Sequence, residues 1–335
     1  MQFVGLPFFF IFMQFMFCFG VRDIDDWRSS NRIESAPIAK TITVDWKGGG
    51  DFYTVQQAID SVPSYNSQWI LIHVRKGVYR EKVTVPEDKP FIYIQGEGAQ
   101  FTMITWDDAK NTEESSTFAI RADNFVAKYI TFENAYDHPV DLLGFTQAVA
   151  VTLYGDKIAF YQCSFKSVQD TLWDNTGRHY FYQCYIQGAV DFIFGMGQSI
   201  YEKCTLHVTA VKDEPHGGYV TAQRRSNPTD PNGFVFKFCT VAGTGKVFLG
   251  RAWGPSSRVV FHNSDISDVV VPEGWDAWTY AGHENNITYS ELGNTGSGSD
   301  MSKRVRWEKK LSAKEWAELL SPSFIDAEEW LYKQP

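Results

Sequence analysis

One six-residue pattern recurs at nearly even spacing in the middle of the chain, at residues 160–165 (FYQCSF), 181–186 (FYQCYI) and 201–206 (YEKCTL). Its cysteine advances by 21 and then by 20 positions, and weaker copies lie at residues 127–132, 236–241 and 261–266. A period near 20 built from short β-rich segments is typical of a solenoid, whereas helical repeats are longer and a leucine-rich repeat needs a leucine frame that is missing here. The pattern predicts an all-β fold, a single-stranded right-handed parallel β-helix with coils about 4.8 Å apart.

Four cysteines follow the pattern along the chain, at Cys163, Cys184, Cys204 and Cys239. Because stacked coils place equivalent residues in ladders, we expect these side chains to point inward as small apolar fillers. An oxidising compartment would permit disulfides, but the spacing does not give their connectivity.

The open ends of a solenoid must be covered, and two segments have the pattern of short capping helices. Residues 54–57 (TVQQ) form a capping-box pattern, and the apolar residues at helical spacing are Val55, Ala58, Ile59 and Val62. Residues 312–315 (SAKE) open a second amphipathic helix, with Leu311, Trp316, Leu319 and Leu320. We expect the first helix to plug the N-terminal end of a single domain and the second to cover the other end.

The composition excludes two broad classes of protein. The 335 residues are 44% hydrophobic and 21% charged, which is wrong for a disordered chain. The net charge of −9 and the lack of a basic run argue against a nucleic-acid partner, because such binding depends on cations that neutralise phosphates.

The first twenty residues carry no Lys, Arg, Asp or Glu and eight of the 26 Phe, which is the pattern of a secretory signal peptide. An uncleaved anchor is the alternative, since the apolar run approaches the length of a membrane span. We therefore expect a signal peptide at residues 1–20, an extension at 21–39 and the catalytic domain at 40–335. Asn286-Ile287-Thr288 is an N-glycosylation acceptor pattern, which is compatible with a secreted glycoprotein.

Two aspartates and two glutamines share the phase of the repeat. Asp170 and Asp191 are 21 residues apart, and Gln147 and Gln169 are 22 apart. On neighbouring coils the carboxyl groups would be roughly 5 Å apart, so the pKa of one should rise. The amides could donate hydrogen bonds to one reacting oxygen. Solvated surface carboxylates are the alternative for a lone aspartate pair, but the repeat phase and the glutamines favour a catalytic site.

Asp191 lies in residues 191–195 (DFIFG), where a carboxylate among apolar side chains needs a cation or takes up a proton. The candidate cation is Arg251 in residues 249–253 (LGRAW), because its planar fork matches a carboxylate. A purely structural ion pair remains the alternative.

Five blocks, in order, resemble the plant-type pectin methylesterases (pectinesterases): residues 77–81 (GVYRE), 147–150 (QAVA), 169–172 (QDTL), 191–195 (DFIFG) and 249–253 (LGRAW). The resemblance covers about residues 40–333 and is closest to the form without the inhibitor-like pro-region. It implies a right-handed parallel β-helix and a carboxylic ester hydrolase that converts methyl-esterified homogalacturonan to pectate and methanol.

The resemblance also implies a role for each polar residue. Asp191 would attack the ester carbonyl, held ionised by Arg251, and Gln147 and Gln169 would bind the oxyanion. Asp170 would act as general acid and then general base. No metal or cofactor is required.

Substrate-binding positions implied by the resemblance are Thr117, Phe118, Gln147, Trp173, Phe194, Arg251, Trp253 and Trp275. Tyr79 and Glu81 match a family motif that we interpret as structural. Arg224 stands where glycine is usual in the family, which could change the groove. Cys204 and Cys239 match a pair that some plant relatives join as a disulfide, with stacked free thiols as the alternative.

The partners that follow are pectin and, as a candidate, a proteinaceous pectinesterase inhibitor. We expect a monomer, secreted to the cell wall, with no membrane contact after signal cleavage. Two other functions compete: a β-helix glycoside hydrolase of polygalacturonate, since two close carboxylates also suit a retaining glycosidase, and a non-catalytic wall-binding homologue.

Overall fold

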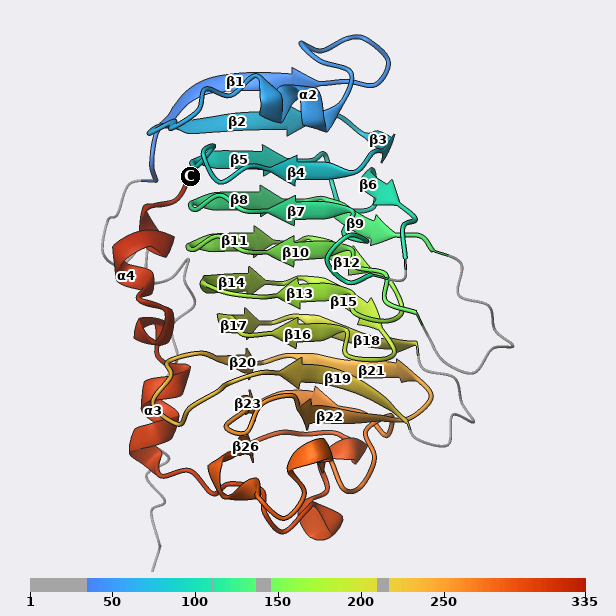
Figure 1. The fold of residues 1–335 in the computed structure, drawn as a ribbon, viewed down its shortest axis with the longest axis vertical. Coiled ribbons are helices and arrows are strands. Elements are labelled where there is room, and N and C mark those ends of the chain that lie inside the picture. The colour runs from blue at the N-terminus through green and yellow to red at the C-terminus, as the bar shows by residue number, and fades with distance from the viewer. Residues whose placement is uncertain (1–34, 110, 137–145, 210–216) are drawn as a thin grey trace, which may run out of the picture. The chain divides into compact units, whose positions relative to one another are not determined.

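The computed structural model describes residues 35–109, 111–136, 146–209 and 217–335. The predicted signal peptide and most of the predicted extension lie outside these described residues. In the described residues, parallel strands form three sheets that wind through stacked coils, which confirms the predicted parallel β-helix (Figure 1). Within the same ranges, no helix is both long enough and apolar enough to cross a membrane.

In the described residues, eight coils contribute one strand to each sheet, and β1 and β26 extend sheet A at its two ends. Sheet A contains β1 (Ile38–Val44), β2 (Trp69–Val74), β5 (Ile92–Gln95), β8 (Phe125–Lys128), β11 (Ile158–Tyr161), β14 (Arg178–Tyr182), β17 (Gln198–Glu202), β20 (Gly233–Lys237), β23 (Arg258–His262) and β26 (Thr288–Leu292). Sheet B contains β3 (Gly77–Arg80), β6 (Thr102–Trp106), β9 (Thr131–Asn134), β12 (Ser164–Lys166), β15 (Tyr185–Gly188), β18 (Thr205–Thr209), β21 (Thr240–Thr244) and β24 (Asp265–Ile266). Sheet C contains β4 (Val83–Val85), β7 (Phe118–Ile120), β10 (Val151–Leu153), β13 (Leu172–Asp174), β16 (Ile193–Gly195), β19 (Gly218–Gln223), β22 (Val247–Ala252) and β25 (Trp275–Asp276).

The helices are short and lie outside the sheets. The α-helices are α2 (Val55–Asp60), α3 (Ala313–Leu320) and α4 (Ala327–Trp330). The 3-10 helices are η1 (Trp278–Tyr280), η2 (Glu284–Asn286), η3 (Ser297–Ser299), η4 (Met301–Lys303), η5 (Pro322–Ile325) and η6 (Leu331–Lys333).

The repeated aromatic position builds a ladder through the core. Phe160, Phe181, Tyr201, Phe236 and Phe261 pair in register along sheet A. Adjacent rings of this ladder stack with centroids 4.4 to 5.3 Å apart. All five side chains are buried, so the ladder contributes both apolar burial and ring packing to each coil interface.

The cysteines lie just beyond this ladder, where the chain turns from sheet A to sheet B. All four are buried free thiols, so the inward-pointing thiol ladder is confirmed and the Cys204–Cys239 disulfide is not formed. The Cys204 Sγ donates to the Phe181 carbonyl oxygen at 3.5 Å, and the Cys239 Sγ donates to the Tyr201 carbonyl oxygen at 3.4 Å. These two thiols therefore each donate to a carbonyl oxygen of the preceding coil.

The N-terminal end is closed as predicted. Helix α2 lies level with β1 and β2 at the N-terminal end of the coil, with Val55, Ala58 and Ile59 buried (Figure 1). Thr54 caps its N-terminus by accepting a hydrogen bond from the Gln57 amide. The Glu81 carboxylate accepts hydrogen bonds from the backbone amides of Val55 and Gln56 at 2.8 and 2.9 Å. These contacts confirm a structural role for Glu81.

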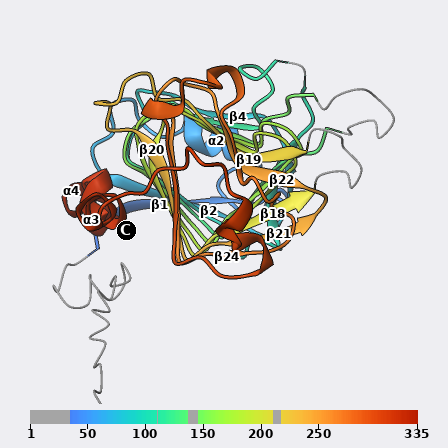
Figure 2. The ribbon, with the colours of Figure 1, turned by 90° about the horizontal axis from the view of Figure 1, so that it is seen from below.

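The second predicted helix forms with a complete capping box between Ser312 and Glu315, but its position differs from the expectation. Figures 1 and 2 show α3 and α4 beside sheet A instead of across the end of the coil. Trp316 contacts the ring of His262 on β23 with centroids 5.8 Å apart. The amphipathic pattern predicts an apolar face, but it does not say which surface that face will cover.

Candidate active site

Asp170 and Asp191 occupy the same position in successive coils, in the turns from sheet B to sheet C. The Asp170 amide donates to the Val190 carbonyl oxygen at 3.1 Å, and Gln169 pairs with Val190 as an isolated parallel bridge. Both aspartates have left-handed backbone conformations, with φ of 60° and 48°. This conformation is energetically unfavourable for non-glycine residues, and it is found in turns and at functional sites. The corner turn therefore places both carboxyl groups at one edge of sheet C.

Asp191 is held by Arg251 from β22. The Arg251 Nε donates to Asp191 Oδ1 at 2.8 Å, and Nη2 donates to Oδ2, so the pair is bidentate. Burial raises the pKa of Asp191, whereas hydrogen bonds from Arg251 and Trp253 oppose that rise. Because a bidentate guanidinium favours the charged form, Asp191 is the carboxyl group of the pair that ionises first.

Arg251 is itself enclosed by aromatic rings. Its guanidinium carbon lies 4.5 Å from the ring centre of Tyr219 and 4.7 Å from that of Trp278. The Tyr219 hydroxyl donates to Asp276 at 2.9 Å, which fixes that ring. These contacts hold the guanidinium in one orientation toward Asp191.

Asp170 has the opposite electrostatic environment. Burial, followed by the charge of Asp191, raises its pKa to about 7. The Thr112 hydroxyl donates to Asp170 Oδ2 at 3.2 Å, and Gln169 also hydrogen-bonds its side chain. A charged carboxylate thus lies beside a carboxyl group that retains its proton near neutral pH, which is the arrangement that separates a nucleophile from an acid.

These groups open into a cleft of about 370 Å³. Eight of the residues predicted from the sequence line it: Gln147, Gln169, Asp170, Trp173, Asp191, Phe194, Arg251 and Trp253. The rings of Trp173 and Phe194 come from adjacent coils and stack 5.6 Å apart, which gives the cleft a flat apolar wall. Trp253, with 43% of its surface exposed, lies 4.8 Å from Trp278 at the rim.

Three predicted substrate contacts lie elsewhere. Thr117 is buried and donates to the Glu133 carbonyl oxygen at 3.0 Å. Phe118 packs inside the coil, and Trp275 is buried against Tyr289 with ring centres 4.6 Å apart. All three side chains are buried and none lines the cleft, so contact of these residues with the sugar stays a prediction.

The cleft also contains residues outside the predicted site set: Thr112, Glu113, Asn175, Met196, Ala222 and Arg224. Thr112 lies 58 positions before Asp170, outside the repeat phase, so no spacing pointed to it. Arg224 had one signal, its departure from the glycine usual in the family. Its side chain is exposed at the cleft, and its amide donates to the Gly195 carbonyl oxygen at 2.8 Å.

The cleft can support acyl transfer. It joins a buried ionised carboxylate, a protonated carboxyl group and two side-chain amides on one surface. Among the described residues, no group of three or more His, Cys, Asp or Glu side chains is placed to hold a metal ion.

Comparisons with known proteins agree with this arrangement. The family model "Pectinesterase" matches residues 41–328. "Probable pectinesterase 29" of Arabidopsis thaliana is 50% identical over 311 residues, which cover 90% of this chain and 93% of that protein. "Probable pectinesterase 55" of the same plant is 50% identical over 308 residues, with coverage of 90% and 93%.

Two solved structures are also similar. A pectin methylesterase from carrot has a TM-score of 0.82 and 32% identity, covering 90% of this chain and 98% of that one. A pectin methylesterase from Aspergillus niger has a TM-score of 0.75 and 27% identity, with the same coverage. The order of the sequence blocks, the parallel β-helix and the extent of these matches lead to one conclusion: the chain belongs to the pectinesterase family.

Proposed function

We propose that this protein hydrolyses the methyl esters of pectin in the plant cell wall, and that Asp191 is its nucleophile. The observation that carries the proposal is the pair of aspartates with opposite environments: Asp191 is bidentate to Arg251, and the pKa of Asp170 is raised to about 7. Membership of the pectinesterase family supports the substrate and the ester chemistry.

In the first half-reaction, an oxygen of the Asp191 carboxylate attacks the ester carbonyl carbon. Negative charge moves to the carbonyl oxygen, where the amides of Gln147 and Gln169 donate hydrogen bonds. The tetrahedral intermediate then collapses with cleavage of the bond to the methoxy oxygen. Asp170 gives its proton to that oxygen, so that methanol leaves and an acyl-enzyme anhydride remains.

In the second half-reaction, the ionised Asp170 removes a proton from water, and the resulting hydroxide attacks the acyl carbonyl. The same two amides bind the second oxyanion. Its collapse breaks the anhydride and restores the Asp191 carboxylate beside Arg251, while Asp170 keeps the proton. The new uronic acid then loses its own proton to solvent.

Trp173, Phe194 and Trp253 would bind the sugar rings, because flat aromatic faces suit the C–H surfaces of a pyranose. Arg224 would contact a carboxylate of an already de-esterified neighbour. We further propose an extracellular monomer, with a pectinesterase inhibitor as a candidate protein partner.

A glycoside hydrolase remains the second candidate, because a close carboxylate pair also suits retaining cleavage. The two amides beside the pair favour the esterase, since acyl transfer needs oxyanion donors. The deciding experiment measures methanol and new reducing ends from one sample of highly methylated pectin. Methanol without reducing ends supports the proposal, and reducing ends without methanol would replace it with the glycosidase.

A further inference from the structure

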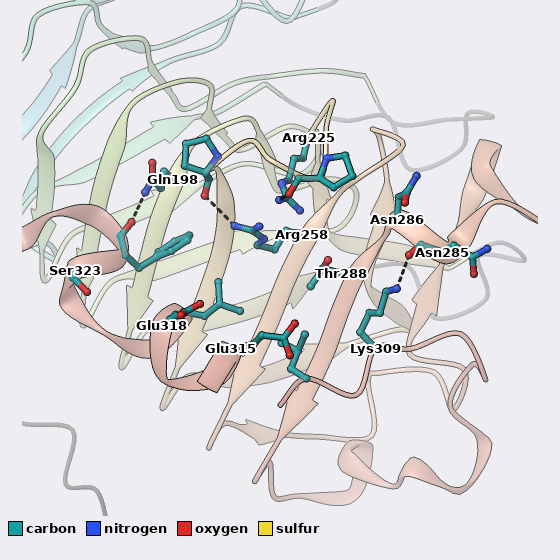
Figure 3. A pocket seen from close by; sticks show the side chains of 15 residues that line it. Gln198, Arg225, Arg258, Asn285, Asn286, Thr288, Lys309, Glu315, Glu318 and Ser323 are labelled. Atoms are coloured by element: carbon teal, nitrogen blue, oxygen red, sulfur yellow. Dashed lines mark hydrogen bonds between the residues drawn. The ribbon is translucent and has the colours of Figure 1, made fainter. Parts of the chain in front are cut away.

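A second cleft, of about 620 Å³, lies on the outer face of sheet A and is separate from the catalytic cleft. Arg258 of β23 and Thr288 of β26 contribute to its floor (Figure 3). Helix α3 forms one wall through Glu318, and the loop before β20 forms the other through Pro231. Its volume is in the range that holds a small ligand or a short oligomer.

Two arginines lie close together in this cleft without a carboxylate partner. Arg225 is only 2% exposed, and its Nε donates to the Asp230 carbonyl oxygen at 2.9 Å. Arg258 Nη1 donates to the Pro231 carbonyl oxygen at 3.1 Å. Among the residues that the structure describes, neither guanidinium has an ion pair within 4.0 Å. Burial and the charge of Arg225 lower the pKa of Arg258 to about 10.

The charge of Asp230, which lies outside the lining, partly offsets the burial that lowers the pKa of Arg225, and the carboxylates of the lining are Glu315 and Glu318. The Asp230 carboxylate accepts the Asn227 amide at 2.9 Å. Glu315 is held by Ser312 in the capping box of α3, and Glu318 lies at 63% side-chain exposure with Lys314 as its partner. A buried guanidinium beside a second, half-buried one is unfavourable without an ion pair, so a bound anion would gain more energy here than at an ordinary surface arginine.

The backbone makes room for this arrangement. Gly233 opens β20 next to Arg258, and a Cβ atom at this position would lie 2.7 Å from the Arg258 Cδ. The missing side chain therefore lets the arginine stem lie across β20. The Pro231 carbonyl oxygen then accepts a hydrogen bond from the guanidinium at the end of this stem.

We infer that this cleft is a second, non-catalytic site that binds a carboxylate of a de-esterified galacturonate oligomer, an inference that rests on the proposed function for the identity of the ligand. The fork of Arg258 matches a carboxylate in two-point geometry. Amide side chains of Gln198 and Asn285 can bond sugar hydroxyl groups, and Pro231 and Phe324 offer apolar surface to ring C–H groups. The same guanidinium could hold inorganic phosphate, so the test includes that anion.

The experiment measures binding of unesterified trigalacturonate to the full chain by isothermal titration calorimetry. Because the trimer carries no ester, it is not turned over, and we expect two sites in the wild type. Arg258→Gln should weaken the second site at least about 10-fold, as expected for loss of a charge-assisted contact. Arg258→Lys should give an intermediate loss, because it keeps the charge without the fork.

The matched control is Lys310→Gln, which removes the same charge from a side chain that is 75% exposed and does not line the cleft. Circular dichroism and thermal melting establish that each variant is folded. Asn286→Gln is titrated in parallel, because Asn286 of the acceptor pattern lines the cleft and a glycan there would narrow its entrance.

Three results would overturn the inference: one site in the wild type and in the Asn286→Gln protein, unchanged binding in a folded Arg258→Gln, or phosphate binding as tight as the trimer. A separate measurement, methanol release from pectin, tests the proposed function. If the wild type releases no methanol from pectin, the catalytic proposal fails whatever the titration shows. If methanol release is normal and the second site is absent, only this inference fails.

Discussion

Arg251 and Arg258 are seven positions apart, on consecutive strands of the same coil, yet they serve two different clefts. Arg251 makes a bidentate pair with Asp191 and is enclosed by aromatic rings. Arg258 has a carbonyl partner and a second arginine beside it. A guanidinium with its own carboxylate fixes the ionisation of that group, whereas one without a carboxylate is available to an anion from solution. The fold places both kinds of site on one repeating frame.

Removing the carboxylate from the first cleft tests this comparison most severely. Asp191→Asn should lower kcat on methylated pectin by about 10⁴-fold or more, because the nucleophile is lost. It should also leave Arg251 without its anion, so trigalacturonate should bind the catalytic cleft more tightly than in the wild type. Methanol release and calorimetry measure the two effects. Retained methanol release in the variant would remove Asp191 from the mechanism.

The second test concerns the proton on Asp170. Its pKa of about 7 in the folded state lies above the ordinary aspartate value of 3.8, so the folded state keeps a proton that the unfolded chain releases between these pH values. The fold should therefore lose stability as pH rises from about 4 to about 7, with no further loss from this group at higher pH. Asp170→Asn should remove a loss on the order of 4 kcal/mol, measured by denaturant unfolding at several pH values.

The same variant should be about 10²- to 10⁴-fold slower in methanol release. In the wild type, kcat/KM should fall as pH rises above about 7, since departure of methanol needs the protonated Asp170. Asp107→Asn, which alters a carboxyl group that is 46% exposed, serves as the control for both measurements. An identical pH dependence of stability in Asp170→Asn and wild type would contradict the assigned pKa.

The smallest expected effect belongs to Arg224, the exposed cation of the catalytic cleft. Arg224→Gly should raise KM for partly de-esterified pectin a few-fold at low salt and leave kcat nearly unchanged, because the side chain lies outside the reacting groups. The effect should shrink as ionic strength rises. Equal KM values for the variant and wild type across degrees of esterification would show that Arg224 is merely solvated.

The repeat made much of the catalytic cleft predictable. The equal spacing predicted that Asp170 and Asp191 lie on neighbouring coils. The apolar sequence around Asp191 predicted a cation beside it, and Arg251 is that cation. The inward or outward direction of an aromatic side chain was not predictable in the same way. Phe118 and Trp275 are of the aromatic type that can contact sugars, but both side chains are buried in the core.

Contacts made by residues outside the repeat phase were also not predictable from the sequence. Thr112 reaches Asp170 from a loop with no periodicity. The second cleft was not predictable from the sequence, because its walls come from distant parts of the chain and α3 lies beside sheet A.

The C-terminal segment has a consequence for biosynthesis. Residues 311–335 run back along sheet A, where Arg178 pairs with Asp326 at 2.9 Å and Lys128 Nζ donates to the Pro335 carbonyl oxygen at 2.9 Å. Early coils can stack on one another as they leave the ribosome, but the C-terminal segment contacts Arg178 only 148 residues later and Lys128 only 207 residues later. The catalytic cleft can thus assemble during translation, whereas the second cleft gains the wall formed by α3 last.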